Sequence, residues 1–236
     1  MLSTAPPSGG LDGFAATFLN GRVMVAWLPR IVEGFGLTVL LAAAIVVAGL
    51  ALGLGLAVLR AMGVRALNLL IVFVVDLFRA LPPLVIIVLL YFGLPSAGVS
   101  LSGFWATWLS LTLVLAAFSE EIFWAGIAAT PRGQWDAARG LGLRPLPTLF
   151  LVVLPQAVRM VVPPLTNRTI AITKGTALAS VVGVAEILGA SQSAMAFSGN
   201  PSPLTLGALA YALLFIPVVG VGRWIERRAA LPGAAR

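Results

Sequence analysis

LTVLLAAAIVVAGLALGLGLAVL, residues 37–59, carries no charged side chain from its first residue to its last. An α-helix rises about 1.5 Å per residue, so about 20 apolar residues cross the roughly 30 Å hydrocarbon core of a bilayer. The stretch therefore predicts a transmembrane helix. Gly49 and Gly53 within it are spaced as GxxxG, which either lets a second helix approach closely or arises by chance in a glycine-rich apolar run.

The composition of the whole chain is that of an integral membrane protein. Of its 236 residues, 60% are hydrophobic and 10% are charged, and the mean hydropathy is +1.05. A soluble domain is about 25% charged and about half apolar. The length suffices for about five crossings of roughly 20 residues each, with no room for a sizeable soluble domain. We expect one membrane domain.

Four more apolar segments complete a predicted all-α fold of about five transmembrane helices. They cover residues 66–95, 104–129, 156–189 and 204–222. The first of them is too long for one straight crossing and contains Pro82-Pro83, which predicts an entry helix, a break at the prolines and a second half that reaches the far side. The third is also long, so we expect a partly embedded stretch before its crossing proper.

The distribution of arginine predicts the orientation of the chain. If the chain begins outside and crosses five times, one side receives Arg60, Arg65, Arg132, Arg139, Arg144, Arg223, Arg227, Arg228 and Arg236. The other side receives Arg22 and Arg30, offset by Asp12 and Glu33. By the positive-inside rule the arginine-rich side and the C-terminus are cytoplasmic, and the N-terminus is outside. The N-terminus lacks the basic region of a cleaved signal peptide, so the first apolar segment serves as the insertion signal.

The residue types disfavour an enzyme and a nucleic-acid-binding protein. The chain has no cysteine and no histidine, which removes thiol nucleophiles, the usual zinc ligands and the commonest general base. Its 15 basic residues stand apart between apolar segments, without the basic stripe and interleaved aromatics that bind nucleic acid. Membrane topology accounts for them better, and we expect no nucleic-acid partner.

A polar insert, GQWDAARGLGLRPLPTLFLVVLP at residues 133–155, separates two of the apolar segments. Thr130 is a candidate N-cap, Pro131 a candidate first helical residue, and Gly142 is placed to end a helix of two or three turns. On physical grounds the insert is either a loop between helices that happens to be helical or a short cytoplasmic helix shaped for docking into a groove of another protein.

The spacing within this insert is specific. Asp136-Ala137-Ala138 is followed after three residues by Gly142, after nine more by Val152, and then by Leu154-Pro155. This pattern resembles the Glu-Ala-Ala loop of bacterial ABC importer permeases, which reads Glu-Ala-Ala, three residues, Gly, nine residues, Ile, one residue, Leu-Pro. Asp replaces Glu and Val replaces Ile, and both replacements are mild.

Further blocks resemble the polar amino acid uptake subfamily of these permeases. They are FRALPPLV, PRGQWDAARGLG, LPQAVRMVVPPLTN and KGTALASVVGVAEI, and the likeness covers about residues 34–228. AGIAATPRGQ and RMVVPPLT look closest to permeases for acidic amino acids. Trp124 stands where the subfamily often has Arg, so a role tied to that Arg does not carry over to this chain.

The resemblance implies an ABC type I importer permease fold in the bacterial cytoplasmic (inner) membrane. Residues 1–33 would be an extracytoplasmic segment, 34–228 the transmembrane domain, with its coupling loop at about 130–155, and 229–236 a cytoplasmic tail. The residues that would couple to the ATPase are Gly133, Gln134, Asp136, Ala137, Ala138, Gly142, Leu154 and Pro155.

The resemblance also implies partners. They are membrane lipid, a dimer of ABC ATPase subunits, a second permease subunit that is a copy of this chain or a related one, and an extracytoplasmic solute-binding protein. No stretch resembles the phosphate-binding loop GxxxxGK[ST], so we expect no cofactor in this chain and ATP and Mg bound by the ATPase. The chain itself is then a transport subunit and not an enzyme.

Charged residues inside apolar segments, together with Asn167 beside one of them, are candidates for the substrate path, because a charge at the bilayer centre costs about 2.5 to 3.5 kcal/mol on insertion scales. The candidates are Asn167, Arg168, Lys174 and Glu121. On one continuous helix Arg168 and Lys174 would point about 120° apart, unless a break near Gly175 relaxes this. The alternative is that these two cations pair structurally with Asp76, Glu120, Glu121 or Glu186. Asp76 and Arg79, three residues apart, could neutralise each other.

Two other functional classes stay open on sequence alone. A secondary transporter would be expected to show inverted repeats and a relay of intramembrane carboxylates, and neither is evident. A structural membrane protein without an ATPase partner is compatible with the composition but needs no insert of this spacing.

Overall fold

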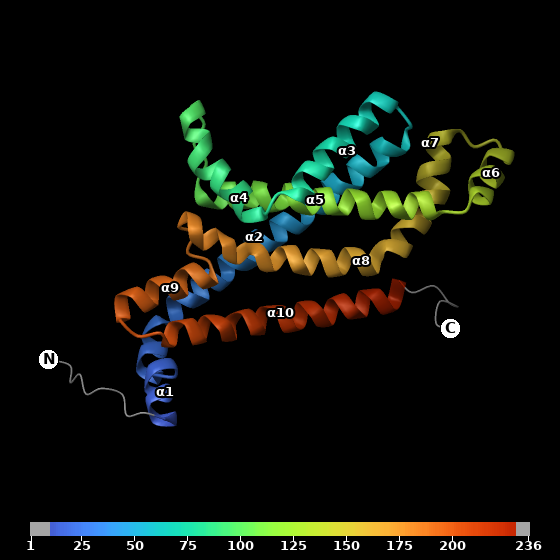
Figure 1. Ribbon diagram of the computed structural model, residues 1–236. Coiled ribbons are helices and arrows are strands. Elements are labelled where there is room, and N and C mark those ends of the chain that lie inside the picture. The colour runs from blue at the N-terminus through green and yellow to red at the C-terminus, as the bar shows by residue number, and fades with distance from the viewer. Residues whose placement is uncertain (1–9, 230–236) are drawn as a thin grey trace.

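The computed structural model describes residues 10–229, apart from the side chains of Leu11 and Asp12, and every element in this part is helical (Figure 1). The main helices are α1 (Leu11–Phe18), α2 (Gly21–Ala61), α3 (Arg65–Ala80), α4 (Pro83–Val88), α5 (Gly103–Ala129), α6 (Arg132–Gly140), α7 (Pro145–Thr148), α8 (Leu154–Lys174), α9 (Ile187–Ser198) and α10 (Ser202–Ala229). Short π and 3-10 segments, Leu89–Gly93, Leu94–Ala97, Leu149–Val153 and Gly175–Val182, extend α4 and α8. Of the expected tail 229–236, only Ala229 lies within the described residues.

The predicted all-α membrane fold is confirmed. Four helical runs are long and apolar enough to cross a membrane, namely Gly13–Ala61, Gly103–Ala129, Pro145–Ser198 and Ser202–Ala229. Arg65–Ala80 and Pro83–Ala97 are long and apolar enough only when they are taken together, and they meet at an angle of 100°. They count as a fifth crossing if they form one broken span. The break falls at Pro82-Pro83, as predicted, where two residues without an N–H cannot continue the hydrogen-bond ladder of α3.

The GxxxG spacing in α2 marks a real close contact. Gly49 and Gly53 are both buried against α5. A Cβ atom at Gly49 would lie 2.8 Å from Cδ2 of Leu115, and one at Gly53 would lie 2.6 Å from Cβ of Ser119. Only glycine therefore permits the present distance between the two backbones.

Helix α5 lies at the centre of the molecule. Leu111 and Leu115 of α5 pack with Leu41 and Ile45 of α2 and Ile87 of α4 in one apolar cluster. A second cluster joins the far half of α5 to the segment around α8 through Phe123, Ile127, Val153, Ala157 and Val161. Helix α10 lies to one side along α2, α8 and α9, and its buried residues are Ser202, Pro203, Gly207 and Gly222.

Several elements that carry or adjoin an arginine gather at one end of the molecule. Figure 1 shows α6, α7, the turn between α2 and α3, and the C-terminal end of α10 toward this end, with α1 at the opposite end. Helix α2 continues unbroken through residue 34, where we expected the transmembrane domain to begin. The division into 1–33, 34–228 and 229–236 stays a prediction.

Candidate functional site

Helix α6 forms within the polar insert, but its start differs from the prediction. Its first residue is Arg132, and Pro131 occupies the capping position without a side-chain hydrogen bond to the helix. Thr130 is not the N-cap: it ends α5, is buried, and donates its hydroxyl to the carbonyl of Gly126 at 3.2 Å. The threonine hydroxyl is directed back to the preceding turn of α5, and α6 has no side-chain capping hydrogen bond.

The end of α6 is a glycine-dependent turn. The N–H of Gly142 donates to the carbonyl of Arg139 at 2.9 Å, and the N–H of Leu143 donates to that of Ala138 at 3.1 Å. This pair of hydrogen bonds is the Schellman motif, which requires a left-handed residue. Gly142 has φ 84°, which is left-handed, so its predicted role in ending the helix is confirmed, and a Cβ atom there would meet nothing within 4 Å.

One side of α6 is anchored and the other is open. Ala138 is buried, and Trp135 packs on the apolar cluster of α5 and α8. Gln134 accepts a hydrogen bond from Nε2 of Gln156 on α8 at 3.3 Å. Gly133, Gln134, Asp136, Ala137 and Gly142 are exposed, as is Pro155, whereas Leu154 is half-buried. Of the two adjacent alanines, Ala137 therefore lies on the open face and Ala138 on the buried face.

The exposed carboxylate of α6 has a local partner. Asp136 Oδ1 lies 2.7 Å from Nη2 of Arg139, one turn later on the same helix. Both side chains are more than half exposed, so the pair contributes at most about 1 kcal/mol to stability. It leaves the outer face of α6 polar and close to neutral around Asp136.

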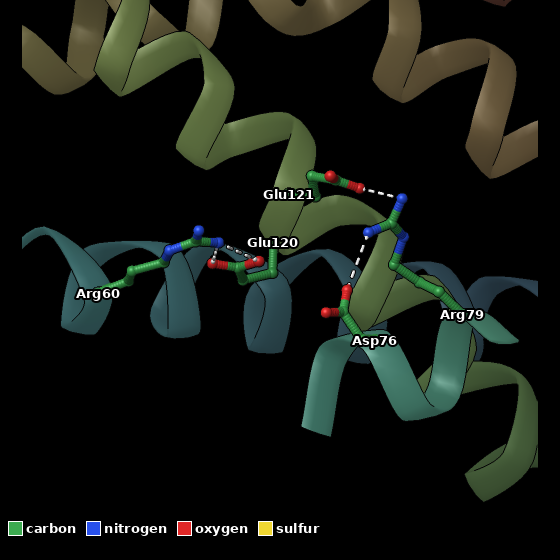
Figure 2. A network of polar contacts seen from close by, with 5 residues as sticks. All are labelled: Arg60, Asp76, Arg79, Glu120 and Glu121. Atoms are coloured by element: carbon green, nitrogen blue, oxygen red, sulfur yellow. Dashed lines mark hydrogen bonds and ion pairs between the residues drawn. The ribbon is translucent and has the colours of Figure 1, made fainter. Parts of the chain in front are cut away.

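Adjacent carboxylates on α5 point to different arginines (Figure 2). Glu120 is fully buried and accepts two hydrogen bonds from Nη1 of Arg60 on α2, at 3.1 Å and 3.3 Å. Arg60 also lies over the ring of Trp124, 4.6 Å from its centroid. The Trp at position 124 thus flanks a guanidinium that reaches it from another helix.

Glu121 pairs with Arg79, which also bonds Asp76 at 3.3 Å (Figure 2). The predicted Asp76–Arg79 pair is therefore confirmed. Two guanidinium groups lie near the ring of Phe118, that of Arg168 at 3.8 Å and that of Arg79 at 5.5 Å from its centroid. Arg168 therefore contacts α5 by a cation–π interaction with Phe118, and no ion pair among the described side chains includes it.

The structural pairing that we considered for Arg168 and Lys174 is wrong for the side chains that the structure describes. Glu120 pairs with Arg60 instead, and Glu121 and Asp76 both pair with Arg79. Glu186 caps α9 by accepting from the N–H groups of Leu188 and Gly189, and it accepts the hydroxyl of Tyr211.

Asn167, Arg168 and Lys174 lie on one continuous helix, since α8 ends only at Lys174. Arg168 faces α5, whereas Asn167 and Lys174 line a groove against α10. No break relaxes the angle between Arg168 and Lys174, so the four candidate path residues form two separate groups. Residues seven apart lie on the same face of a helix. The spacing of Asn167 and Lys174 could therefore have predicted from the sequence that these two residues share a face.

Comparisons with known proteins place this architecture in a family. Residues 49–231 match the family described as "Binding-protein-dependent transport system inner membrane component". The chain belongs to this family. The match includes the insert with α6 and the helices that carry the charged residues described above.

Related proteins of this family match over most of their length. The arginine transport system permease protein ArtQ of Bacillus subtilis (strain 168) is 31% identical over 212 residues, which cover 89% of this chain and 97% of that protein. The probable glutamine ABC transporter permease protein GlnM of the same organism is 35% identical over 217 residues, covering 89% and 98%.

Solved structures agree with the fold. A chain from the crystal structure of an amino acid ABC transporter with histidines matches with a TM-score of 0.80 and 28% identity, over 89% of this chain and 98% of that chain. A chain of the inward-facing MetNI methionine ABC transporter matches with a TM-score of 0.64 at 21% identity, over 89% and 99%. The second likeness shows the fold alone, and both have the type I importer permease architecture expected from the sequence.

Some residues of the charged groups were not foreseen. The Arg60–Glu120 pair joins positions far apart in the sequence, so no local spacing predicts it. Arg223 and Glu226 line the same groove as Asn167 and Lys174. The sequence suggested only an arginine-rich helix end at that place.

Proposed function

We propose that this chain is the permease subunit of an ATP-driven importer that carries a polar amino acid across the inner membrane of a bacterium. The family match over residues 49–231 is the observation that carries the proposal. The amino acid is inferred from relatives whose names refer to arginine and glutamine transport. The segments AGIAATPRGQ and RMVVPPLT look closest to permeases for acidic amino acids, which favours a substrate with an acidic side chain.

Helix α6 couples the permease to a separate ATPase that binds ATP and Mg. Its exposed residues Gly133, Gln134, Asp136 and Ala137 offer a polar outer face for a groove on that subunit. Trp135 attaches α6 to the cluster of α5 and α8, and Ala138 is buried, so displacement of α6 would move those helices. Gly142 and Leu154-Pro155 fix the return of the chain into the membrane.

The permease works as one half of a membrane dimer over two ATPases, fed by an extracytoplasmic binding protein. About five crossings enclose only part of a path, so a second permease subunit must complete it. The mass of the complex extracted in mild detergent tests this proposal. Two permease chains for two ATPase chains is the expected composition, and a single permease chain that transports at the full rate contradicts it.

Two groups of side chains are proposed to face the substrate. Arg168 lies over the ring of Phe118 on α5, and Glu121, three residues later on α5, is already paired with Arg79. Asn167 and Lys174 face α10. A cation among these groups would hold the carboxylate that every free amino acid carries.

The deciding experiment is uptake by the complex reconstituted in liposomes with its ATPase and binding protein. Radiolabelled glutamate, glutamine, arginine and histidine are compared, with and without ATP inside the vesicles. ATP-dependent uptake of at least one of them is expected. Uptake of one of them without ATP would indicate a secondary transporter, and uptake restricted to sugars would refute the amino acid class.

A further inference from the structure

The contact between α8 and α10 is tight at one glycine. A Cβ atom at Gly222 of α10 would lie 2.7 Å from Cγ2 of Thr166 and 3.2 Å from Cδ1 of Ile170, both on α8. This contact forms a seam between the two helices. Side chains on the two flanks of the seam face different surroundings.

One flank of the seam is apolar. The groove there is shared by α2, α8 and α10, and its lining includes Val46, Leu165, Val218, Val221 and Ile225. None of its lining residues carries a charge. Such a surface is compatible with lipid acyl chains.

The opposite flank of the seam is polar. A groove of about 580 Å³ there is lined by Asn167 and Lys174 of α8 and by Val219, Arg223 and Glu226 of α10. This volume lies within the range of about 300 to 1,000 Å³ that is usual for small-molecule sites. We call it the α8–α10 groove.

The charges of the α8–α10 groove are not neutralised within the chain. Among the side chains that the structure describes, no ion pair within 4.0 Å includes Lys174, Arg223 or Glu226. Lys174 instead has its ammonium group 5.9 Å from the ring centre of Phe215. Charged side chains on membrane helices avoid lipid and face protein or a water-filled cavity. Asn167 and Lys174 lie within the predicted apolar segment 156–189, where this rule applies, whereas Arg223 and Glu226 lie just beyond the predicted crossing at 204–222, at the arginine-rich end of the molecule. The polar flank therefore faces protein or water at Lys174 and opens toward that end at Arg223 and Glu226.

We propose that the α8–α10 groove is a water-filled section of the translocation path that binds an amino acid by its zwitterionic group. Arg223 and Glu226 are three residues apart on α10, so their side chains are neighbours of opposite charge. Arg223 holds the carboxylate and Glu226 the ammonium group of the substrate. Lys174 adds a second positive charge, which favours a substrate with an anionic side chain and opposes a cationic one. This inference rests on the proposed function.

The absence of cysteine from the chain permits a direct test. Val219→Cys places a thiol in the α8–α10 groove, and Val221→Cys places one on the apolar flank as a matched control on the same helix. Val221 is 55% exposed and Val219 is only half-buried, so surface exposure alone would favour reaction at position 221. Water filling of the groove predicts the reverse.

The complex with its ATPase is reconstituted in liposomes and treated with sulfonatoethyl methanethiosulfonate, an anionic thiol reagent that does not cross membranes. A thiolate forms readily only in water, so Val219→Cys should react about tenfold faster than Val221→Cys or more. The amino acid that the unmodified complex takes up should slow the reaction at position 219 and leave position 221 unchanged. Equal rates, slow reaction at both positions, or absence of protection would overturn the proposal.

Charge variants give an independent measurement. Arg223→Gln and Glu226→Gln should each raise the apparent KM for uptake, about tenfold for the loss of one charged hydrogen bond. Arg228→Gln is the control, because Arg228 lies over Trp224 on the same helix and outside the groove. If the unmodified complex imports an amino acid and these KM values do not change, the groove is not the site and the proposed function stands. If it imports no amino acid, both are wrong.

Discussion

At the scale of single residues, glycine sets the distance between α2 and α5. A methyl group at Gly53 would lie 2.6 Å from Cβ of Ser119 and 2.7 Å from the carbonyl oxygen of Ala116. Gly53→Ala should therefore lower the free energy of unfolding by about 1 to 3 kcal/mol, the usual cost of overpacking. Unfolding of the purified protein by SDS in mixed micelles measures this change.

Gly55→Ala is the control for this substitution. Gly55 lies on the same helix two residues later and is exposed, and a methyl group there would meet nothing within 4 Å. Its replacement should leave the free energy of unfolding unchanged or raise it by up to about 1 kcal/mol, because alanine favours the helical conformation more than glycine does. A similar loss for both alanine variants would show that the close contact with α5 is not what makes glycine necessary.

The ion pair between Arg60 and Glu120 should matter more than the one between Arg139 and Asp136. The Glu120 side chain is 0% exposed and that of Arg60 is 20% exposed, whereas Arg139 and Asp136 are 58% and 68% exposed. Arg60→Met leaves a buried carboxylate without its partner, so it should cost about 3 to 5 kcal/mol in the same SDS titration. Arg139→Met should cost less than about 1 kcal/mol.

A double substitution separates the pair from the space that it fills. Arg60→Met with Glu120→Leu removes both charges and should restore part of the stability lost in Arg60→Met, because no uncompensated charge remains. If the double variant is less stable than Arg60→Met alone, the packing of the two side chains outweighs their charges. That result would contradict the electrostatic account.

At the scale of elements, the end of α6 depends on a single glycine. Gly142 has φ 84°, and a residue with a Cβ atom pays about 1 kcal/mol or more in this left-handed conformation. Gly142→Val should therefore lengthen or tilt α6, and transport should fall while the amount of inserted protein is nearly unchanged. Gly140→Val, at a glycine with no positive φ and with open space around it, is the control.

The coupling role of α6 would fail on a specific result. If the Gly142→Val complex retains its ATPase in full yield and transports at the unmodified rate, α6 is only a loop. Asp136→Lys gives a second measurement, since charge reversal on the exposed face should weaken docking, whereas Asp136→Glu should be tolerated. Loss of Asp136→Lys protein from the membrane would instead indicate a folding defect.

The sequence predicted those features of the elements that depend on near neighbours. The break at Pro82-Pro83 follows from missing N–H groups, and the stop at Gly142 from the conformational freedom of glycine. The start of α6 was missed because Thr130 ends α5 and directs its hydroxyl toward that helix, so Pro131 is the residue that precedes α6. A capping residue between two helices can serve either one, and packing decides which.

The charged groups were predicted only in part for a similar reason. Asp76 and Arg79 are neighbours on one helix, so their pair was foreseeable. Arg60 meets Glu120 only because α2 packs on α5, and Arg223 meets the Asn167 face only because Gly222 lets α10 approach α8. Contacts of this kind depend on the distances between helices, which apolar periodicity does not specify.

At the scale of the whole molecule, the arginine-rich elements share one end, and this arrangement predicts the orientation. Figure 1 places α6 and the C-terminal end of α10 toward that end, and the chain between α4 and α5 lies away from α6. Positive side chains are retained on the cytoplasmic side during insertion. Helix α6 should therefore face the cytoplasm, and Ser96, in the Leu94–Ala97 turn, should face the outside.

Single cysteines at Ser96 and Gly140 test this orientation, since both positions are exposed and the chain has no cysteine of its own. In intact cells treated with a charged thiol reagent that reaches only the outer face of the inner membrane, Ser96→Cys should react and Gly140→Cys should not. Inverted vesicles should give the opposite pattern. Because ATP is hydrolysed in the cytoplasm, reaction of Gly140→Cys from outside would place α6 beyond the reach of any ATPase. That single result would refute both the orientation and the coupling role of α6, whereas uptake would still test whether the chain transports an amino acid.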